Sequence, residues 1–244
     1  MPFYTVKTPN NFYEATAFNP SRKLARTSVG VLWCCYSGPD GGGIRQIFVS
    51  YSSDNGLNWT EEQITTAPVH EQVSPSLAID SGDNVHLVWE ARLNWPPVVT
   101  EIQYRQRTAI GWGAVEHVTA IGKIQHAPSI AVDSGDNVHV VWRGAGWGAN
   151  PLYRNIQYRQ RVAGVWQPHE SISDIAAHQL WDTGSIAIDA ADIVHVVWSG
   201  FGWGGNPGDY NVQYRQRVAG VWGIQEAITD LATWNHMPCV ALDS

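Results

Sequence analysis

An internal repeat of 53 to 56 residues runs through most of the chain, and it constrains the fold more than any other feature of the sequence. Each well-preserved copy contains an apolar stretch, a short polar turn and a second apolar stretch ending in tryptophan, as at 74–89, 127–142 and 183–198. A Gln-Tyr-Arg-Gln-Arg motif follows, and a last tryptophan closes the copy. The closing residues are Trp59, Trp112, Trp166 and Trp222. A regular period of this length is typical of architectures in which each copy forms one small structural unit.

Each copy predicts four short strands and very little helix. Alternating β-branched or aromatic residues are separated by turns rich in Gly, Asn and Asp, which is the pattern of antiparallel hairpins. No stretch has a convincing 3.6-residue apolar period. Four antiparallel strands repeated radially describe a propeller blade, so we predict an all-β, single-domain β-propeller of four-stranded antiparallel blades. The four complete copies span about 20–74, 75–127, 128–183 and 184–237.

The last residues match only part of a fifth copy. Residues 238–244 resemble the opening strand of a repeat, and residues 3–8 have the alternation of an outermost strand. The sequence is compatible with a piece of a longer propeller, with closure by another chain, or with a four-bladed ring that has displaced ends. Because an unpaired strand edge favours pairing with another chain, we predict a homo-oligomer formed through the truncated fifth blade.

The first copy carries a complete Asp-box, S-x-D-x-G-x-x-W, at Ser52, Asp54, Gly56 and Trp59. In this spacing the aspartate accepts hydrogen bonds from turn N–H groups, the glycine supplies a positive φ and the tryptophan packs between sheets. Later copies keep the tyrosine-to-tryptophan distance but replace the aspartate with Arg107, Arg161 and Arg217. Together, the motif and the period resemble the Asp-box β-propellers of the bacterial neuraminidase (sialidase) type. The resemblance implies that fold.

The same resemblance supplies no complete set of catalytic residues. Sialidases of this type use an arginine triad, a Tyr–Glu nucleophile pair and an aspartate acid/base. Their first arginine lies in a Tyr/Phe-Arg-Ile-Pro signature, of which residues 21–24 keep only Arg22. Since fold alone does not give activity, the sequence predicts that the protein is not an enzyme. A sialidase-like glycosidase is the least favoured function.

Tryptophans occupy two kinds of position in the repeat. Those that end the second strand, together with the closing tryptophans, are predicted to pack between blades. The former are Trp89, Trp142 and Trp198. Another set lies between the second and third strands, where Gly and Pro favour irregular backbone. This set is Trp95, Trp147 and Trp203, with Asn150 and Asn206 near the last two.

These Trp/Asn loops are the candidate ligand-binding site. An indole on a Gly-bracketed loop offers a flat apolar face, and a nearby amide can hydrogen-bond hydroxyl groups, a combination that suits a sugar ring. Because the loop recurs, weak single contacts add up to avidity. We therefore predict a lectin-like, multivalent, non-catalytic module that binds a glycan. The alternative is a structural or protein-interaction scaffold in which the tryptophans pack onto the next blade.

Arginines, glutamates and histidines also recur in register. Each full Gln-Tyr-Arg-Gln-Arg motif carries two arginines, and a glutamate follows each closing tryptophan by four residues in the last three copies. We predict a cross-strand charge ladder within each hairpin, with an anion-binding stripe as the alternative.

His86, His139 and His195 share one strand position. Equivalent positions on separate blades do not converge on one point, so we expect no metal site.

The net charge and the lack of certain motifs narrow the classes of partner and cofactor that the chain is expected to bind. The formal net charge of −7 disfavours nucleic acid or an anionic membrane as a general partner. No apolar run approaches the ~20 residues that a membrane helix needs. Residues 1–20 show neither the basic nor the apolar region of a signal peptide, although the family resemblance favours an extracellular protein. The chain has no phosphate-binding or zinc motif, and we expect no cofactor.

Overall fold

The computed structural model describes residues 22–94, 99–177, 184–235 and 237–242, and within these ranges the chain forms strands and no helix. The strands make four antiparallel sheets, numbered from the N-terminus. Sheet 1 consists of β1 (Leu24–Arg26), β2 (Leu32–Pro39), β3 (Arg45–Ser52) and β4 (Thr60–Gln63). Sheet 2 consists of β5 (Gln72–Ile79), β6 (Val85–Asn94), β7 (Val99–Thr108), β8 (Gly111–Trp112) and β9 (Glu116–His117). Sheet 3 consists of β10 (Gln125–Val132), β11 (Val138–Gly144), β12 (Asn155–Val162), β13 (Val165–Trp166) and β14 (Glu170–Ser171). Sheet 4 consists of β15 (Ser185–Ile188), β16 (Val194–Gly200), β17 (Asn211–Val218), β18 (Val221–Trp222) and β19 (Glu226–Ala227).

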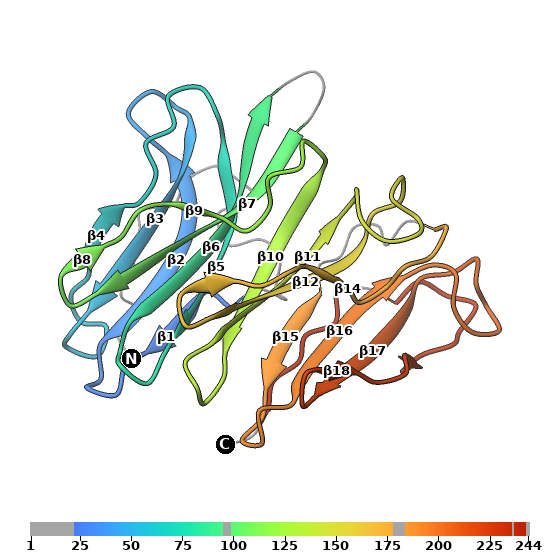
Figure 1. The fold of residues 1–244 in the computed structure, drawn as a ribbon. Helices are drawn as coiled ribbons and strands as arrows, with labels where there is room; N and C mark the ends of the chain where they lie inside the picture. The colour runs from blue at the N-terminus through green and yellow to red at the C-terminus, as the bar shows by residue number, and fades with distance from the viewer. Residues whose placement is uncertain (1–21, 95–98, 178–183, 236, 243–244) are drawn as a thin grey trace.

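The sheets follow one another around an arc, from β1–β4 in blue to β15–β18 in orange and red (Figure 1). Consecutive strands pair within each sheet, and the first strands of neighbouring sheets contact one another. The predicted all-β class and the antiparallel unit of each copy are therefore confirmed. The predicted start of a fifth copy is residues 238–244, of which the structure describes 238–242. These residues form no strand, although Val240 N donates a hydrogen bond to Ser185 Oγ at 3.2 Å.

The predicted fourth strand is interrupted in sheets 2, 3 and 4. In sheet 3, for example, β13 and β14 both pair with β12 and are separated by a short irregular stretch. The interruption leaves the carbonyl of Gln167 outside the ladder, and this oxygen accepts a hydrogen bond from Arg159 Nε at 2.6 Å. Arg105 and Arg215 make the same bond in sheets 2 and 4. A side chain thus satisfies the backbone group that the strand break exposes.

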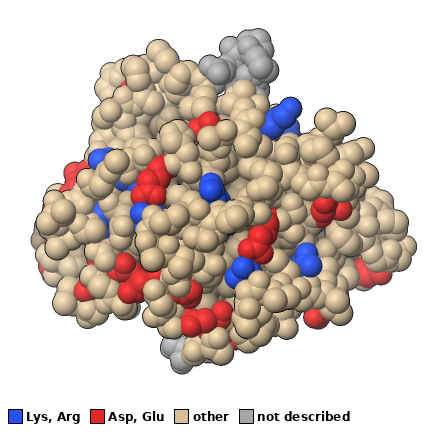
Figure 2. All heavy atoms as spheres, in the orientation of Figure 1, with Lys and Arg blue, Asp and Glu red and all other residues tan. Residues whose placement is uncertain are grey.

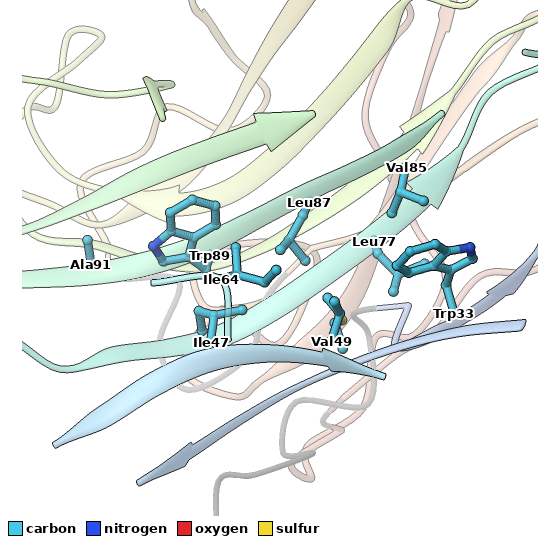
Figure 3. Packing of buried hydrophobic residues seen from close by; sticks show 10 residues of the cluster. Trp33, Ile47, Val49, Ile64, Leu77, Val85, Leu87, Trp89 and Ala91 are labelled. Carbon is cyan, nitrogen blue, oxygen red and sulfur yellow. The ribbon is translucent and has the colours of Figure 1, made fainter. Parts of the chain in front are cut away.

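Apolar side chains fill the space between neighbouring sheets. Figure 3 shows the cluster in which Trp33 and Val49 of sheet 1 meet Leu87 and Trp89 of sheet 2. The second-strand tryptophans are fully buried, as predicted. Truncating a buried tryptophan to alanine costs about 3–5 kcal/mol, so these residues hold successive sheets together.

Glutamates pair with arginines of the next sheet, so the predicted ladder within each hairpin is wrong. Glu116 of sheet 2 accepts hydrogen bonds from Arg161 of sheet 3, at 3.0 Å from Nε and 2.8 Å from Nη2. It also accepts one from Trp166 Nε1 at 2.9 Å. Glu170, Arg217 and Trp222 repeat the arrangement between sheets 3 and 4. Strand side chains stand off the sheet faces, so a long arginine reaches the sheet packed against it.

Of the repeated histidines, His86 and His139 are core residues, whereas His195 is partly exposed. His86 Nδ1 lies 2.7 Å from Tyr104 Oη, and its Nε2 lies 3.0 Å from Asp80 Oδ2. Burial lowers the pKa of His86, although the hydrogen bond with Asp80 opposes this shift. His139 has the same environment. In the described part of the chain, no group of three or more His, Cys, Asp or Glu residues is arranged to hold a metal ion.

The Asp-box turn has the geometry that its spacing predicts. Asp54 Oδ1 accepts hydrogen bonds from Asn58 N at 2.9 Å and Ser52 Oγ at 2.7 Å. Gly56 has φ +87°, and Trp59 Nε1 donates to its carbonyl at 3.1 Å. These hydrogen bonds, first of all the one from the Asn58 backbone, lower the pKa of Asp54 to about 2.

Candidate functional site

The loop that carries Trp147 joins β11 to β12 and is held in place by a carboxylate. Asp174 accepts hydrogen bonds from the backbone N–H of Ala149 at 2.7 Å and of Asn150 at 3.0 Å, and from the Asn150 side-chain amide at 3.1 Å. Burial acts to raise the pKa of Asp174, but the loop hydrogen bonds outweigh it and lower the pKa. Gly148 has φ +77°, and a Cβ at this position would collide with Asp174. The hydrogen bonds to Asp174 therefore hold this loop in a defined conformation.

The loop with Trp203, between β16 and β17, repeats this geometry. Asp230 accepts hydrogen bonds from Gly205 N at 2.7 Å, Asn206 N at 2.9 Å and the Asn206 amide at 3.1 Å. The amide nitrogens of both predicted asparagines thus hold their own loops. Trp203 Nε1 is buried and has no hydrogen-bond partner among the described residues.

Trp147 lies half-buried beside a groove between sheets 2 and 3. Its ring meets Trp142 edge-on, with centroids 5.8 Å apart, and lies 4.7 Å from the ring of His169. The groove has a volume of about 280 Å³, and Ile121 and Arg159 are among its other walls. Trp147 therefore packs on the core and also borders an open cavity.

A second groove occupies the corresponding place between sheets 1 and 2. It has a volume of about 440 Å³ and is bordered by His70, Trp89, Leu93 and Arg105. Arg105 and Arg159 share one repeat position, so the fold repeats the groove. Trp95, the third predicted platform, lies outside the described residues.

A charged network, formed by Arg45, Glu71, Glu90, Arg92 and His126, lies at strand ends of sheets 1, 2 and 3. Arg45 donates two hydrogen bonds to Glu71, at 2.9 Å and 2.6 Å. Arg92 bridges the two carboxylates, at 2.8 Å from Glu71 and 3.2 Å from Glu90. His126 Nδ1 lies 3.1 Å from Glu90, which is only 2% exposed. The network leads from the surface to a buried carboxylate.

Electrostatics keep both carboxylates of the network ionised at neutral pH. Hydrogen bonds from Arg45 lower the pKa of Glu71. Burial acts to raise the pKa of Glu90, but His126 and Arg92 outweigh it, and the pKa lies below its usual value. Ionised carboxylates can act as bases or nucleophiles, and histidine is the residue type that exchanges protons near neutral pH.

Sequence reasoning brought out the loops but missed this network. Its signal was a departure from the repeat, because Glu90 stands where the next two copies have Arg143 and Ser199. A buried charge that only one copy carries is not required by the repeated packing.

Neither a protein-family model nor a curated protein sequence matches the chain. Solved structures do match. An α-L-arabinanase of Penicillium chrysogenum in complex with arabinobiose has a TM-score of 0.63 at 12% identity, over 88% of this chain and 68% of that one. The NanB sialidase of Streptococcus pneumoniae has a TM-score of 0.60 at 9% identity, over 93% of this chain and 54% of that one. A Dyadobacter fermentans protein of unknown function has a TM-score of 0.58 at 12% identity, over 84% of this chain and 63% of that one. The chain thus spans between about half and two thirds of the length of these structures, and it has a sialidase-like β-propeller fold.

These comparisons correct the expectation that the protein is not an enzyme. The arabinanase and the sialidase are both enzymes that act on carbohydrates, and a thermostable family-43 glycoside hydrolase has a TM-score of 0.52. The expectation rested on the lack of one family's motifs, whereas the fold carries several unrelated sets of catalytic residues.

Figure 2 shows acidic and basic side chains interspersed on a largely uncharged face. Within the described ranges, no helix is long and apolar enough to cross a membrane.

Proposed function

We propose that the protein is a carbohydrate-binding β-propeller in which sugar rings bind in the grooves between neighbouring sheets. The observation that carries the proposal is that Trp147 borders a cavity, and that the fold repeats this cavity one sheet away. A concave site with an aromatic wall and a few polar groups is the usual form of a small-ligand site. The arabinobiose bound to the similar arabinanase supports a sugar as the ligand class.

Trp203 is the second platform in this proposal. Its loop repeats the Asp-anchored geometry of the Trp147 loop, and its side chain is half-buried as that of Trp147 is. Trp95 remains the third platform. Asn150 and Asn206 contact the ligand through their amide oxygens, because their amide nitrogens hold the loops. Several modest sites on one chain would give lectin-like avidity.

A glycan array, followed by titration of tryptophan fluorescence, tests the proposal with the full chain. The wild-type protein is expected to bind saturably. The double variant Trp147→Ala/Trp203→Ala should bind about tenfold more weakly or worse, which corresponds to ~1.4 kcal/mol of stacking energy. Trp234→Ala is the matched control, because Trp234 is 67% exposed and lies outside the Trp/Asn loops. Equal losses in the double variant and the control, or no binding by the wild type, would contradict the proposal.

A second candidate function is glycoside cleavage at the charged network. Buried Glu90 is the observation that favours it, because an ion in the interior costs stability and marks functional sites more often than chance. Most glycoside hydrolases work with paired carboxyl groups, and Arg92 holds Glu71 and Glu90 in one network.

Product release from aryl glycosides and from arabinan tests this second function. Turnover by the wild type should disappear in Glu90→Gln and persist in Glu226→Gln, a surface control from sheet 4. Absence of turnover, or equal turnover in both variants, would exclude cleavage at Glu90.

We also propose that the chain is a single Asp-box propeller domain that self-associates and is located outside the cell. The Asp54 turn supports membership of the Asp-box propellers, with the repeats forming one domain. Self-association through the edge beyond sheet 4 is supported by Ile228, which is 58% exposed, whereas Ile172 at the same repeat position is 1% exposed. Sedimentation at increasing concentration tests it, and a monomer throughout would exclude it. An extracellular location is consistent with a glycan ligand.

A further inference from the structure

Each groove contains one arginine that is clamped by backbone carbonyls. Arg159 donates from Nε to Gln167 O and from Nη1 to Val118 O, both at 2.6 Å. Arg105 makes the corresponding pair of bonds at 2.7 Å and 2.9 Å. The clamps fix each guanidinium across two sheets. Within the described residues, no hydrogen bond uses the Nη2 group of either arginine.

These arginines differ from their neighbours on the same strands. Arg161, two residues after Arg159, is ion-paired with Glu116. By contrast, no carboxylate of the described residues lies within ion-pair distance of Arg105 or Arg159, and neither groove has an Asp or Glu in its lining. The two guanidiniums lie over the rings of Trp112 and Trp166, each 5.8 Å from the ring centroid, but these contacts do not neutralise the charge as a counter-ion does. An anion that enters the groove would supply that counter-ion.

A histidine accompanies the arginine in each groove. His70 lines the groove of Arg105, and His169 lines the groove of Arg159. Trp147 lies 4.7 Å from the His169 ring, so an aromatic platform, a guanidinium and an imidazole border one cavity. Burial and the charge of Arg159 lower the pKa of His169, and a bound anion acts in the opposite direction.

We propose that these grooves select acidic sugars, whose carboxylate or sulfate group binds Arg159 in the groove where a ring stacks on Trp147, and Arg105 in the groove one sheet away. The inference rests on the proposed carbohydrate-binding function and adds the class of glycan. A planar guanidinium held at two nitrogens presents its remaining N–H groups in a fixed direction, which suits oxyanions better than a mobile lysine does. The uncharged remainder of the lining favours the sugar body.

The experiment pairs each acidic oligosaccharide with its own neutral form. Oligogalacturonate is measured beside its carboxyl-reduced derivative, and a sulfated oligosaccharide beside its desulfated one, by fluorescence titration of the full chain. Loss of a charge-assisted hydrogen bond predicts about ten- to hundredfold weaker binding of the neutral partner. The carboxylate and sulfate pairs show which anion the groove takes. Added salt should weaken the binding of the acidic ligand more than the binding of its neutral partner.

Two variants separate the anion site from a purely structural staple. Arg159→Gln/Arg105→Gln should remove the preference for the acidic ligand while the neutral ligand still binds, and the melting temperature reports any loss of folding. Arg161→Gln removes a neighbouring arginine that already has a carboxylate partner, so it should lower stability and leave the preference unchanged. If the double variant fails to fold, the paired ligands and the wild-type protein still decide the question.

The paired ligand titrations have three informative outcomes. Stronger binding of the acidic partner, lost in the arginine double variant, supports the proposal. Equal or stronger binding of the neutral partner, still dependent on Trp147, overturns the acidic preference but leaves the carbohydrate-binding function intact. Absence of binding by every member of the pairs overturns the acidic preference, and the glycan array decides the carbohydrate-binding function separately.

Discussion

Glu116→Gln tests whether the Glu–Arg–Trp contacts between sheets stabilise the fold. Glu116 accepts two hydrogen bonds from Arg161 and one from Trp166, and the side chains of Glu116 and Arg161 are 32% and 14% exposed. Hydrogen bonds to charged groups contribute about 1.5–3 kcal/mol each, and partial exposure of the carboxylate reduces this. Glutamine keeps the shape but leaves Arg161 without its counter-ion. We therefore expect a loss of ~2–3 kcal/mol in the free energy of unfolding.

The repeat supplies a matched control for this experiment. Glu226 has the same position in sheet 4 as Glu116 in sheet 2, but it is exposed, and no described residue forms a side-chain hydrogen bond or ion pair with it. Glu226→Gln should change stability by less than about 0.5 kcal/mol. Urea unfolding followed by tryptophan fluorescence measures both variants, and a double-mutant cycle with Arg161→Met isolates the pair. Equal losses at the two glutamates, or no coupling in the cycle, would refute the reasoning.

Three further predictions concern a turn, a buried histidine pair and the Trp147 loop. Ala163 has φ +46° in a two-residue hairpin turn, so Ala163→Asn should stabilise the protein by about 0.5–1 kcal/mol in urea unfolding, and a loss would contradict the turn assignment. Burial lowers the pKa of His86 and His139 from 6.5; the unfolded chain therefore binds more protons below that pH, and stability should fall as the pH decreases. Melting temperatures at about pH 7.5 and pH 5 measure this, and His86→Gln/His139→Gln should reduce the slope if the histidines cause it. Gly148→Ala places a methyl group against Asp174 at a positive φ, so it should lower the melting temperature and shift the Trp147 emission, whereas an unchanged spectrum would show that the loop is not held there.

The architecture was predictable because the repeat encodes its own packing. Alternation and turn residues defined the strands of each copy, and the large tryptophans at fixed positions indicated where neighbouring units meet. The break in the fourth strand was missed, although Pro168 in sheet 3 and the glycines that directly follow Trp112 and Trp222 disfavour a continuous strand there. Only the structure shows that Arg159 binds the carbonyl that the break leaves outside the ladder.

The candidate site, like the fold, was predictable from the sequence only in part. The loops of Trp147 and Trp203 were visible as repeated Trp/Asn segments, but their anchors, Asp174 and Asp230, lie 24 residues from the asparagines they hold. The charged network joins residues from three sheets, so no local pattern indicated it. Glu90 was detectable only as a departure from the repeat.

By itself, the sequence determined the class of fold and the identity of the core tryptophans. These properties depend on short-range periodicity and on side-chain size, which a linear pattern records. The tertiary structure alone decided that Glu116 pairs with the next sheet, that Arg159 stands without a carboxylate partner among the described residues and that Trp147 borders a cavity. Partner choice and open space depend on how one sheet lies against another, and that geometry exists only after the copies have packed.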